Sequence, residues 1–359
     1  MMKFAIVTLI GDNQGNRLQN YALQQILAMR GCNVETLKNY SESEVSLRAK
    51  VSKSIKTVLA LFIRKYYVEK KRHDLFKEFN KNIVFSKYTV TNEHIPNGVL
   101  TEYDCFICGS DQVWNADYLQ NGIVNFLGFA PTSRKASFAA SLGTKVIATE
   151  RVGEIKQYLD SFEEISVRES SSVPILKSIT NRPIRVDLDP SLLLYEEDWR
   201  NKERRPQNLG TRPYILLYFL GSISEKAWDI ANQIKVEHGY DLIDLNDPGW
   251  YGKVGPSQFL YLINHAESVL TDSFHGTAFS IIFHKQFLSF RRDGIGQEME
   301  DRITNLLDSI GLQDRFVVDA CVSISKINYN EVDHLLETER KKSLEYIDRI
   351  IEKCKRVVE

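Results

Sequence analysis

Short apolar runs alternate with segments of helical period along the whole chain. An apolar run of four to eight residues between turn residues is typical of a strand covered on both faces, whereas apolar residues at every third or fourth position indicate an amphipathic helix. In the first half, such runs predict strands at Phe4–Ile10, Val34–Leu37, Cys105–Cys108, Ala136–Ala139, Ile165–Val167 and Ile184–Val186. Helices are expected between them, at Arg17–Arg30, over much of 46–82, at Glu150–Leu159 and shortly after Glu169.

The same alternation restarts after residues 201–213, NKERRPQNLGTRP, which are polar, charged and interrupted by proline and glycine, as in an interdomain linker. The second half predicts strands at Tyr214–Leu220, Leu242–Leu245, Ser268–Leu270 and Gln286–Phe290, and helices at Glu225–Glu237, Ser257–Asn264 and Thr277–Phe283. We therefore expect two α/β domains with parallel sheets, over 1–203 and 204–328. A charged amphipathic helix within 329–359 is expected to pack back on the first domain.

The amino-acid composition serves mainly to exclude some classes of partner and site. The chain has 359 residues, of which 43% are hydrophobic, and a formal net charge of −1, so nothing global indicates a nucleic-acid partner. Its five scattered cysteines fit a reducing cytoplasm better than a disulfide framework. Cys105 and Cys108 lie within the predicted strand CFIC, where positions i and i+3 face opposite sides, which argues against a zinc or redox pair.

The start of the chain, MMKFAIVTLIGDN, has no small-residue cleavage site, so we expect no signal peptide and a cytoplasmic protein. Residues 46–82 depart from the average, with 11 Lys and Arg against 3 Asp and Glu. A basic amphipathic helix here could contact the inner face of an anionic membrane. Alternatively, its apolar stripe packs on its own domain and its charges are solvated.

The corner TDSFHG, residues 271–276, joins a predicted strand to a predicted helix. The first N–H groups of a helix lack partners and that end is positive, so the corner is suited to phosphate or carboxylate. Ser273 could cap the helix, and Gly276 could let a ligand approach the backbone. The alternative is an ordinary corner with a capping serine and a hydrogen-bonded His275.

Two loops of the first half carry groups suited to a sugar. IGDNQGNRLQNYAL follows the first strand, and FICGSDQVWN ends another. Amides, a carboxylate and an aromatic ring would contact hydroxyls and the C–H face of a sugar, and the residues concerned are Asn13, Asn16, Ser110, Asp111, Trp114 and Asn115. The alternatives are an asparagine-capped turn and a tryptophan buried in the core.

Arg168 ends a further strand in SVRESSS, where it could hold a carboxylate or phosphate in a two-pronged contact or pair with Glu169. Asp187 and Asp189 in VDLDPS read as structural. The histidines lack companions at metal-ligand spacing, so no metal is expected.

Taken together, these segments resemble the polysaccharide pyruvyl transferases. The stretches that carry the resemblance follow the family's order over about residues 1–290: GDNQGNRLQNYAL, FICGSDQVWN, ASFAASLG, ISVRESSS, DPSLLL and GPSQFLYLINHAESVLTDSFHGTAFSIIFHKQF. The resemblance implies two facing Rossmann-like domains similar to GT-B glycosyltransferases. It implies phosphoenolpyruvate as co-substrate without a further cofactor. The acceptor would be a sugar of a cell-surface polysaccharide, such as capsule or exopolysaccharide, or its lipid-linked precursor, and the product a pyruvate ketal across two hydroxyls.

The resemblance also assigns roles to residues. His275 matches the histidine that the family uses with its donor, and Arg168 matches a family arginine. Donor-binding residues are accordingly expected at Arg168, Ser273, Gly276 and Thr277, and acceptor-binding residues in the two loops of the first domain. One departure is that some relatives carry an arginine where this chain has Ser273.

Ketal formation protonates the methylene carbon of phosphoenolpyruvate, after which a sugar hydroxyl attacks the adjacent carbon, phosphate leaves and a second hydroxyl closes the ring. His275 suits the acid, and Asp111 is the candidate for taking the hydroxyl proton. Two other functions fit the same fold: a GT-B glycosyltransferase using a nucleotide sugar, and a non-catalytic glycan-binding protein.

Overall fold

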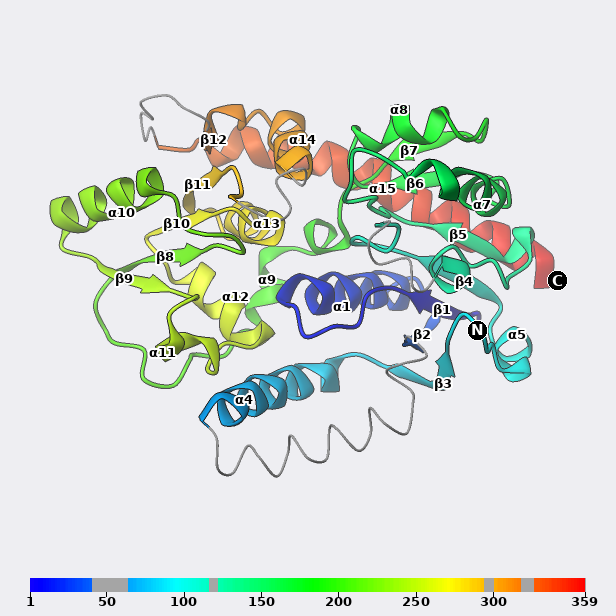
Figure 1. Ribbon diagram of the computed structural model, residues 1–359, viewed down its shortest axis with the longest axis horizontal. Helices are drawn as coiled ribbons and strands as arrows, with labels where there is room; N and C mark the ends of the chain where they lie inside the picture. Colours follow the sequence, from blue (N-terminus) through cyan, green and yellow to red (C-terminus); the bar gives the residue numbers. More distant parts are fainter. Residues whose placement is uncertain (41–63, 116–121, 294–299, 318–325, 359) are drawn as a thin grey trace. The chain divides into compact units, whose positions relative to one another are not determined.

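The computed structural model describes residues 1–40, 64–115, 122–293, 300–317 and 326–358 (Figure 1). Its described residues form two compact units. The first takes its residues from Met1–Ile63, Asn80–Leu193 and Glu339–Glu359, and the second from Arg64–Phe79 and Leu194–Thr338. The predicted boundary at 203 differs from this division, which places residues 194–203 in the second unit. Trp199, for example, packs edge-on against Phe279 of that unit, with ring centroids 5.0 Å apart.

Five described strands form the parallel sheet of the first unit, in the order β3-β2-β1-β4-β5. They are β1 Lys3–Val7, β2 Asn33–Asn39, β3 Phe85–Val90, β4 Cys105–Cys108 and β5 Lys135–Ser137. Two further parallel strands, β6 Ile165–Val167 and β7 Ile184–Val186, continue from it through a bridge between Ala140 and Val167. Its described helices include α1 Gln14–Ala28, α5 Asn97–Glu102, α6 Gly122–Asn125, α7 Thr149–Leu159 and α8 Ser172–Lys177. The order of the five strands is that of the first five strands of the Rossmann fold.

The second unit is built on another parallel sheet, in the order β12-β11-β10-β8-β9. Its strands are β8 Tyr214–Tyr218, β9 Asp241–Asp244, β10 Ser268–Thr271, β11 Gln286–Phe290 and β12 Phe316–Val317. Its helices include α9 Glu196–Arg200, α10 Glu225–His238, α11 Pro248–Tyr251, α12 Pro256–Asn264, α13 Phe274–Ile282 and α14 Asp301–Ser309. This is the other common doubly wound order. The predicted α/β architecture with parallel sheets is confirmed.

Burial explains why the sheets form where the apolar runs predicted them. Every residue of β4 and of β8 is buried, as expected for central parallel strands with helices on both faces. The first-unit core extends from Val7 and Phe106 to the large rings of Trp114, Phe126 and Phe162. Strand β1 ends at Val7 rather than at Ile10, because the Ile10 carbonyl accepts a hydrogen bond from Arg17 instead of from a neighbouring strand.

Helix α4, Arg64–Phe79, belongs to the second unit although it lies early in the sequence. Phe76 and Phe79 are buried, and a Cβ on Gly255 would lie 2.6 Å from that of Leu75, so only glycine permits this approach. Of the two alternatives left open for this segment, α4 shows the packed one: its apolar face is buried, and it packs within the second unit. The remainder of that basic segment, 46–63, lies outside the described residues.

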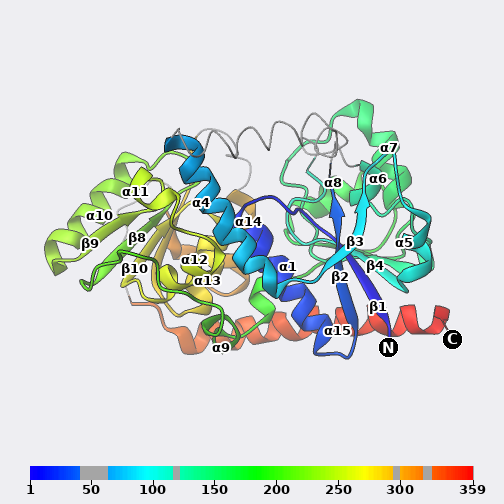
Figure 2. The same cartoon turned by 90° about the horizontal axis from the view of Figure 1, so that it is seen from below.

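Helix α15, Tyr329–Val358, starts in the second unit and ends in the first. Its last part packs on the first unit, as predicted: Arg340 donates to the Leu192 carbonyl at 2.6 Å, and Ser343 accepts from Leu188 N–H at 3.0 Å. Figure 2 shows the end of this helix beside the start of β1.

A disulfide joins Cys105 of β4 to Cys354 of α15, with the two Cα atoms 6.0 Å apart. The sequence did not indicate this pair, because the two residues are 249 positions apart and no spacing pattern links them. The bond fixes the last turns of α15 to the central sheet of the first unit.

We expect Cys354→Ser to lower the free energy of unfolding by about 2–5 kcal/mol, because the cross-link that restricts the unfolded chain is lost. Denaturant unfolding of the oxidised protein measures this. Cys32→Ser is the matched control, since Cys32 is also buried in the first unit but free. Non-reducing peptide mapping should recover the Cys105–Cys354 peptide pair. Its absence, together with equal stability of both variants, would contradict the disulfide.

Candidate active site

The strand order of each sheet identifies one point, at the carboxyl ends of two neighbouring strands, where a ligand is expected. Open α/β sheets bind ligands beyond the carboxyl ends of strands, where the strand order reverses. In the first unit this point lies between β1 and β4, and in the second between β8 and β10. The loops that follow β1 and β4 contain Asn13 and Asp111, Asn16 lies in the first turn of α1, and the loop that follows β10 contains Ser273. The topology therefore brings the predicted polar loops to these two points.

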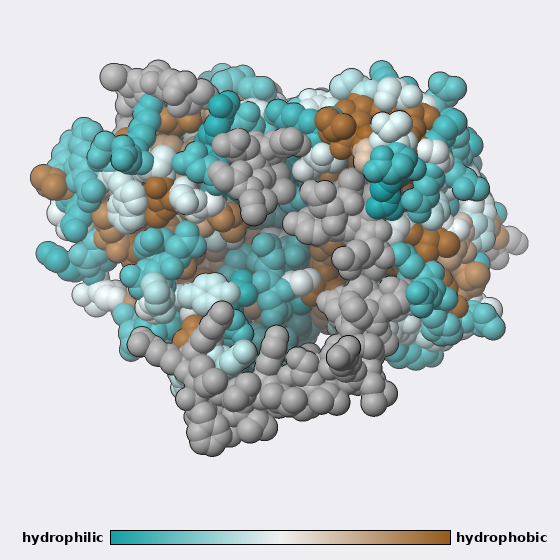
Figure 3. Space-filling model, in the orientation of Figure 1, coloured by the Kyte–Doolittle hydropathy of each residue, from teal (hydrophilic) through white to brown (hydrophobic). Residues whose placement is uncertain are grey.

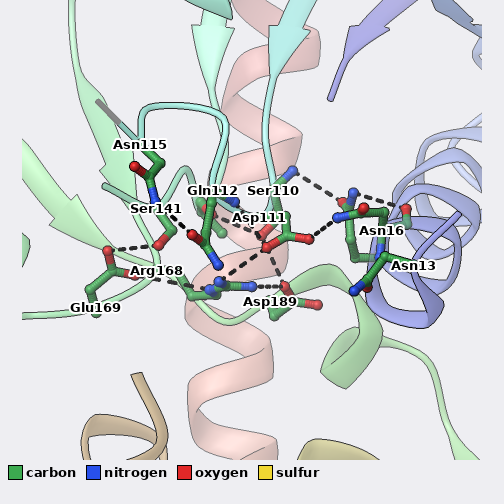
Figure 4. Close-up of polar contacts among 12 residues, drawn as sticks. Asn13, Asn16, Ser110, Asp111, Gln112, Asn115, Ser141, Arg168, Glu169 and Asp189 are labelled. Carbon is green, nitrogen blue, oxygen red and sulfur yellow. Dashed lines mark hydrogen bonds and ion pairs between the residues drawn. The ribbon is translucent and has the colours of Figure 1, made fainter. Parts of the chain in front are cut away.

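Arg168 is the centre of a buried charged cluster in the first unit (Figure 4). Its guanidinium lies 2.8 Å from Asp189, 3.5 Å from Asp111 and 3.9 Å from Glu169. At most 7% of any of these four side chains is exposed. Burial alone would lower the pKa of Arg168, but the three carboxylates outweigh burial and raise this pKa above its usual value. The arginine is therefore a permanent cation already surrounded by anions.

Asp111 is held in place from several directions. Its Oδ2 accepts from Asn16 Nδ2, and its Oδ1 accepts from the Gln112 N–H at 2.9 Å. The backbone of Asp111 has φ of 67°, a region that residues other than glycine rarely adopt and that is over-represented at functional sites. The preceding Ser110 donates to Asp189 at 2.9 Å, and its N–H donates to Gln19. A carboxylate is thus fixed at the first of the two points.

Other predicted residues of the first unit have mainly local roles. Asn13 caps α1 by accepting from Asn16 N–H at 3.3 Å, and Asn115 donates to Gln112 at 2.8 Å. Trp114 is only 1% exposed and stacks on Phe126 with ring centroids 5.1 Å apart. The expectation that its ring stacks on a sugar is corrected: the ring belongs to the core, because the motif does not reveal which face of the loop the side chain takes.

In the second unit, Ser273 caps α13, as the sequence predicted. Its hydroxyl accepts from Gly276 N–H at 3.4 Å, and its own N–H donates to Thr271 at 3.0 Å. His275 lies in the first turn of α13 and is 7% exposed. Thr277 bonds to the Ser273 carbonyl and to Ser289. The corner is therefore rigid and supported by neighbouring elements.

Packing explains why position 276 is a glycine, which the sequence alone did not indicate. A Cβ at this position would overlap the Thr271 hydroxyl. The space beside its Cα is filled by β10 rather than left open, so the expectation of close ligand approach there is corrected. Glycine is required for α13 to pack against the end of the strand.

The sequence motifs did not single out two residues that support the corner in the second unit. Asp272 accepts from the N–H groups of Leu220 at 2.6 Å and Gly221 at 2.8 Å, which fastens the loop after β8 to the corner after β10. Arg292, after β11, lies with its Nε 3.4 Å from Asp272 and donates to the Asp272 carbonyl at 3.3 Å. Asp272 stands inside the TDSFHG corner, so its sequence position was the available signal.

In the first unit, Asp189 and Glu169 were also not assigned to the site, although their neighbour Arg168 was. Glu169 accepts from Ser141 at 2.9 Å and from Leu142 N–H at 3.1 Å. Asn16, Ser110, Asp111 and Arg168 come together in the first unit, and Ser273, His275, Gly276 and Thr277 in the second. Arg168, expected among the donor residues, is a first-unit residue bound to carboxylates. Within the described residues, no three His, Cys, Asp or Glu side chains are grouped as a metal site.

Comparisons with known proteins give a family match and a fold match. The family model of polysaccharide pyruvyl transferase matches residues 13–294. No curated protein matches the sequence. The solved structure of UDP-GlcNAc 2-epimerase from Methanocaldococcus jannaschii aligns with a TM-score of 0.53 and 13% identity, covering 98% of this chain and 99% of that one. At this identity the likeness establishes a shared fold.

Two further structures align less closely. UDP-GlcNAc 2-epimerase from Neisseria meningitidis bound to UDP-GlcNAc has a TM-score of 0.42 and 10% identity over 99% of this chain and 94% of that one. UGT89C1 of Arabidopsis thaliana complexed with quercetin has a TM-score of 0.45 and 10% identity, covering 98% of this chain and 99% of that one.

Proposed function

Because the chain belongs to the polysaccharide pyruvyl transferase family, we propose that it transfers pyruvate from phosphoenolpyruvate to a saccharide as a ketal. The observation that carries this proposal is His275, held in the first turn of α13 at the strand-order reversal of the second unit. An imidazole that can transfer a proton, beside helix N–H groups suited to an anion, matches a reaction that protonates an anionic enol phosphate.

In this mechanism His275 donates a proton to the methylene carbon of phosphoenolpyruvate, which becomes the methyl group. Positive charge develops at the adjacent carbon and is attacked by the first hydroxyl of the acceptor. The C–O bond to phosphate then breaks, and the second hydroxyl closes the ketal ring, passing its proton to the departing phosphate. The positive end of α13, with the Ser273 hydroxyl, would face the phosphate and carboxylate of the donor, and Thr277 would hold the corner through its bonds to Ser273 and Ser289.

Asp111 is proposed to take the proton from the attacking hydroxyl. Its carboxylate is oriented by Asn16 and by the Gln112 N–H, so it is fixed before the acceptor arrives. Asn13, Ser110 and Asn115 lie in the same two loops and are proposed to line the acceptor site. Since Arg168 is bound to three carboxylates, we assign it the positioning of Asp111 rather than contact with the donor.

The test is a reaction with phosphoenolpyruvate and a panel of saccharides that carry two neighbouring free hydroxyls. We expect one phosphate released per product, and a product mass higher by pyruvate less one water. Blocking either hydroxyl should stop ketal formation. Consumption of a nucleotide sugar without phosphate release would support the glycosyltransferase, and glycan binding without turnover would support the binding protein.

We also propose that the enzyme works in the cytoplasm at the inner membrane face, on a lipid-linked acceptor, through the basic residues of 46–82. Within the described residues, no helix is long and apolar enough to cross a bilayer. On the face shown in Figure 3, hydrophilic side chains cover most of the described surface and apolar ones are dispersed among them. Contact would therefore be electrostatic, with α4 offering the exposed Lys70, Lys71 and Lys77.

We expect the protein to sediment with anionic vesicles at low salt and to be released at high salt, because each lysine near such a surface contributes about 1 kcal/mol and salt screens it. Lys70→Glu/Lys71→Glu should weaken this binding, and neutral phosphatidylcholine vesicles serve as the control. Equal absence of binding at both salt concentrations would leave α4 as a packing helix alone.

A further inference from the structure

Arg17, in the first turn of α1, is a buried arginine whose hydrogen-bonding capacity is largely unused. It is 4% exposed. Its Nη2 donates to the Ile10 carbonyl at 2.6 Å and lies 3.5 Å from Asp12, whose side chain is 30% exposed. Among the residues that the structure describes, Nε and Nη1 have no hydrogen-bond partner. Since Nε carries one N–H and Nη1 carries two, three donors of a buried cation remain unsatisfied.

Such an arrangement indicates a ligand. Buried polar groups in native proteins are nearly always hydrogen-bonded, and an exception calls for an explanation such as a functional role, an ordered water or a bound ion. Burial lowers the pKa of Arg17, and Asp12 and Tyr40 offset this only in part. An arginine nevertheless stays charged near neutral pH, so Arg17 is a cation with incomplete compensation.

Arg17 and Arg168, both buried in the first unit, differ in how much negative charge already surrounds them. Arg168 is in contact with three carboxylates, so its cluster already carries an excess of negative charge. Arg17 has one partly exposed carboxylate at 3.5 Å. An anionic ligand would thus be repelled from Arg168 and attracted to Arg17.

The position of Arg17 indicates which anion. It lies in the first turn of α1, which has no acidic residue there and which follows the loop after β1, where the strand order reverses. A helix start together with a guanidinium is suited to a phosphoryl group. The neighbouring Asn16 bonds to Asp111, the proposed base, so this anion would sit next to the acceptor sugar.

We propose that Arg17 binds a phosphoryl group attached to the acceptor saccharide, so that the substrate is a phosphate-linked sugar rather than a neutral glycan. This rests on the proposed function. Phosphoenolpyruvate also carries a phosphate, and the experiment separates the two sources.

Binding is measured first, by calorimetry on the full-length protein with inorganic pyrophosphate as the probe. We expect wild type to bind it, Arg17→Gln to bind at least about tenfold more weakly, and Arg17→Lys to be intermediate, because one charge-assisted contact is lost or reduced. Arg30→Gln is the control, since Arg30 follows the other end of α1 and pairs with Asp348. Circular dichroism confirms that each variant is folded. Equal binding by wild type and Arg17→Gln, or no binding by wild type, would overturn the proposal.

Turnover then identifies the source of the phosphate. With hexose 1-phosphates and the corresponding methyl hexosides as probes, Arg17→Gln should raise KM for the phosphorylated acceptors and leave KM for phosphoenolpyruvate unchanged. A raised KM for phosphoenolpyruvate alone would assign Arg17 to the donor and overturn the inference. Failure of the proposed function would look different: pyrophosphate would still bind through Arg17, while wild type released no phosphate from phosphoenolpyruvate.

Discussion

Replacing His275 with alanine is expected to lower kcat for phosphoenolpyruvate-dependent transfer by about 10²–10⁴-fold, the usual contribution of a positioned general acid. In the proposed mechanism the loss would arise because the first turn of α13 has no other ionisable side chain to protonate the methylene carbon. Phosphate release from phosphoenolpyruvate in the presence of an acceptor measures it.

The variant should remain folded, which circular dichroism and thermal unfolding would verify. His238→Ala is the matched control: His238 belongs to the same unit, at the end of α10, and its side chain is 48% exposed. It should keep wild-type kcat. Retention of more than about a tenth of the wild-type rate by His275→Ala would remove this residue from the general-acid role.

Replacing Arg168 with methionine is expected to lower the free energy of unfolding by about 3–5 kcal/mol, because it leaves buried carboxylates without their counter-charge. Asp189 has a fully buried side chain 2.8 Å from the guanidinium, so its charge would be the least compensated. Chemical denaturation with both unfolding curves at the same pH measures the difference. Turnover should fall as well, since Asp111 loses the group that positions it.

Arg200→Ala is the control for this experiment. Arg200 pairs with Glu196 on the surface of α9 with 56% of its side chain exposed, and such pairs contribute at most about 1 kcal/mol. If Arg168→Met were as stable as wild type and only KM for phosphoenolpyruvate rose, Arg168 would contact the donor, as the family resemblance implied.

The roles of Arg168 and Arg17 depend on contacts that the local sequence does not predict. SVRESSS drew attention to Arg168, and the resemblance assigned it to the donor. The three carboxylates around it come from the ends of β4, β6 and β7, and their convergence depends on strand order. Arg17 belongs to the motif GDNQGNRLQNYAL, where the sequence pattern predicts only that it is a helix residue. Its burial and missing partners appear only when the loop after β1 folds over it.

The basic segment shows the same limit at the level of domains. Its apolar positions correctly indicate that one face of α4 is covered. They contain no information about which surface covers it, and the glycine that accommodates Leu75 lies 180 positions later, at Gly255. The pairing of Cys105 with Cys354 is equally non-local.

The sequence by itself determined the α/β class, the parallel sheets, the capped start of α13 and the family, because these depend on local periodicity, on capping within one turn and on motifs read in order. The tertiary structure decided that Trp114 is a core residue, that Gly276 serves packing and that α4 belongs to the second unit. It also decided that Arg168 is neutralised while Arg17 is not. The physical reason is that burial and ion pairing depend on which strands become neighbours, and strand order is set by contacts among residues far apart in the chain.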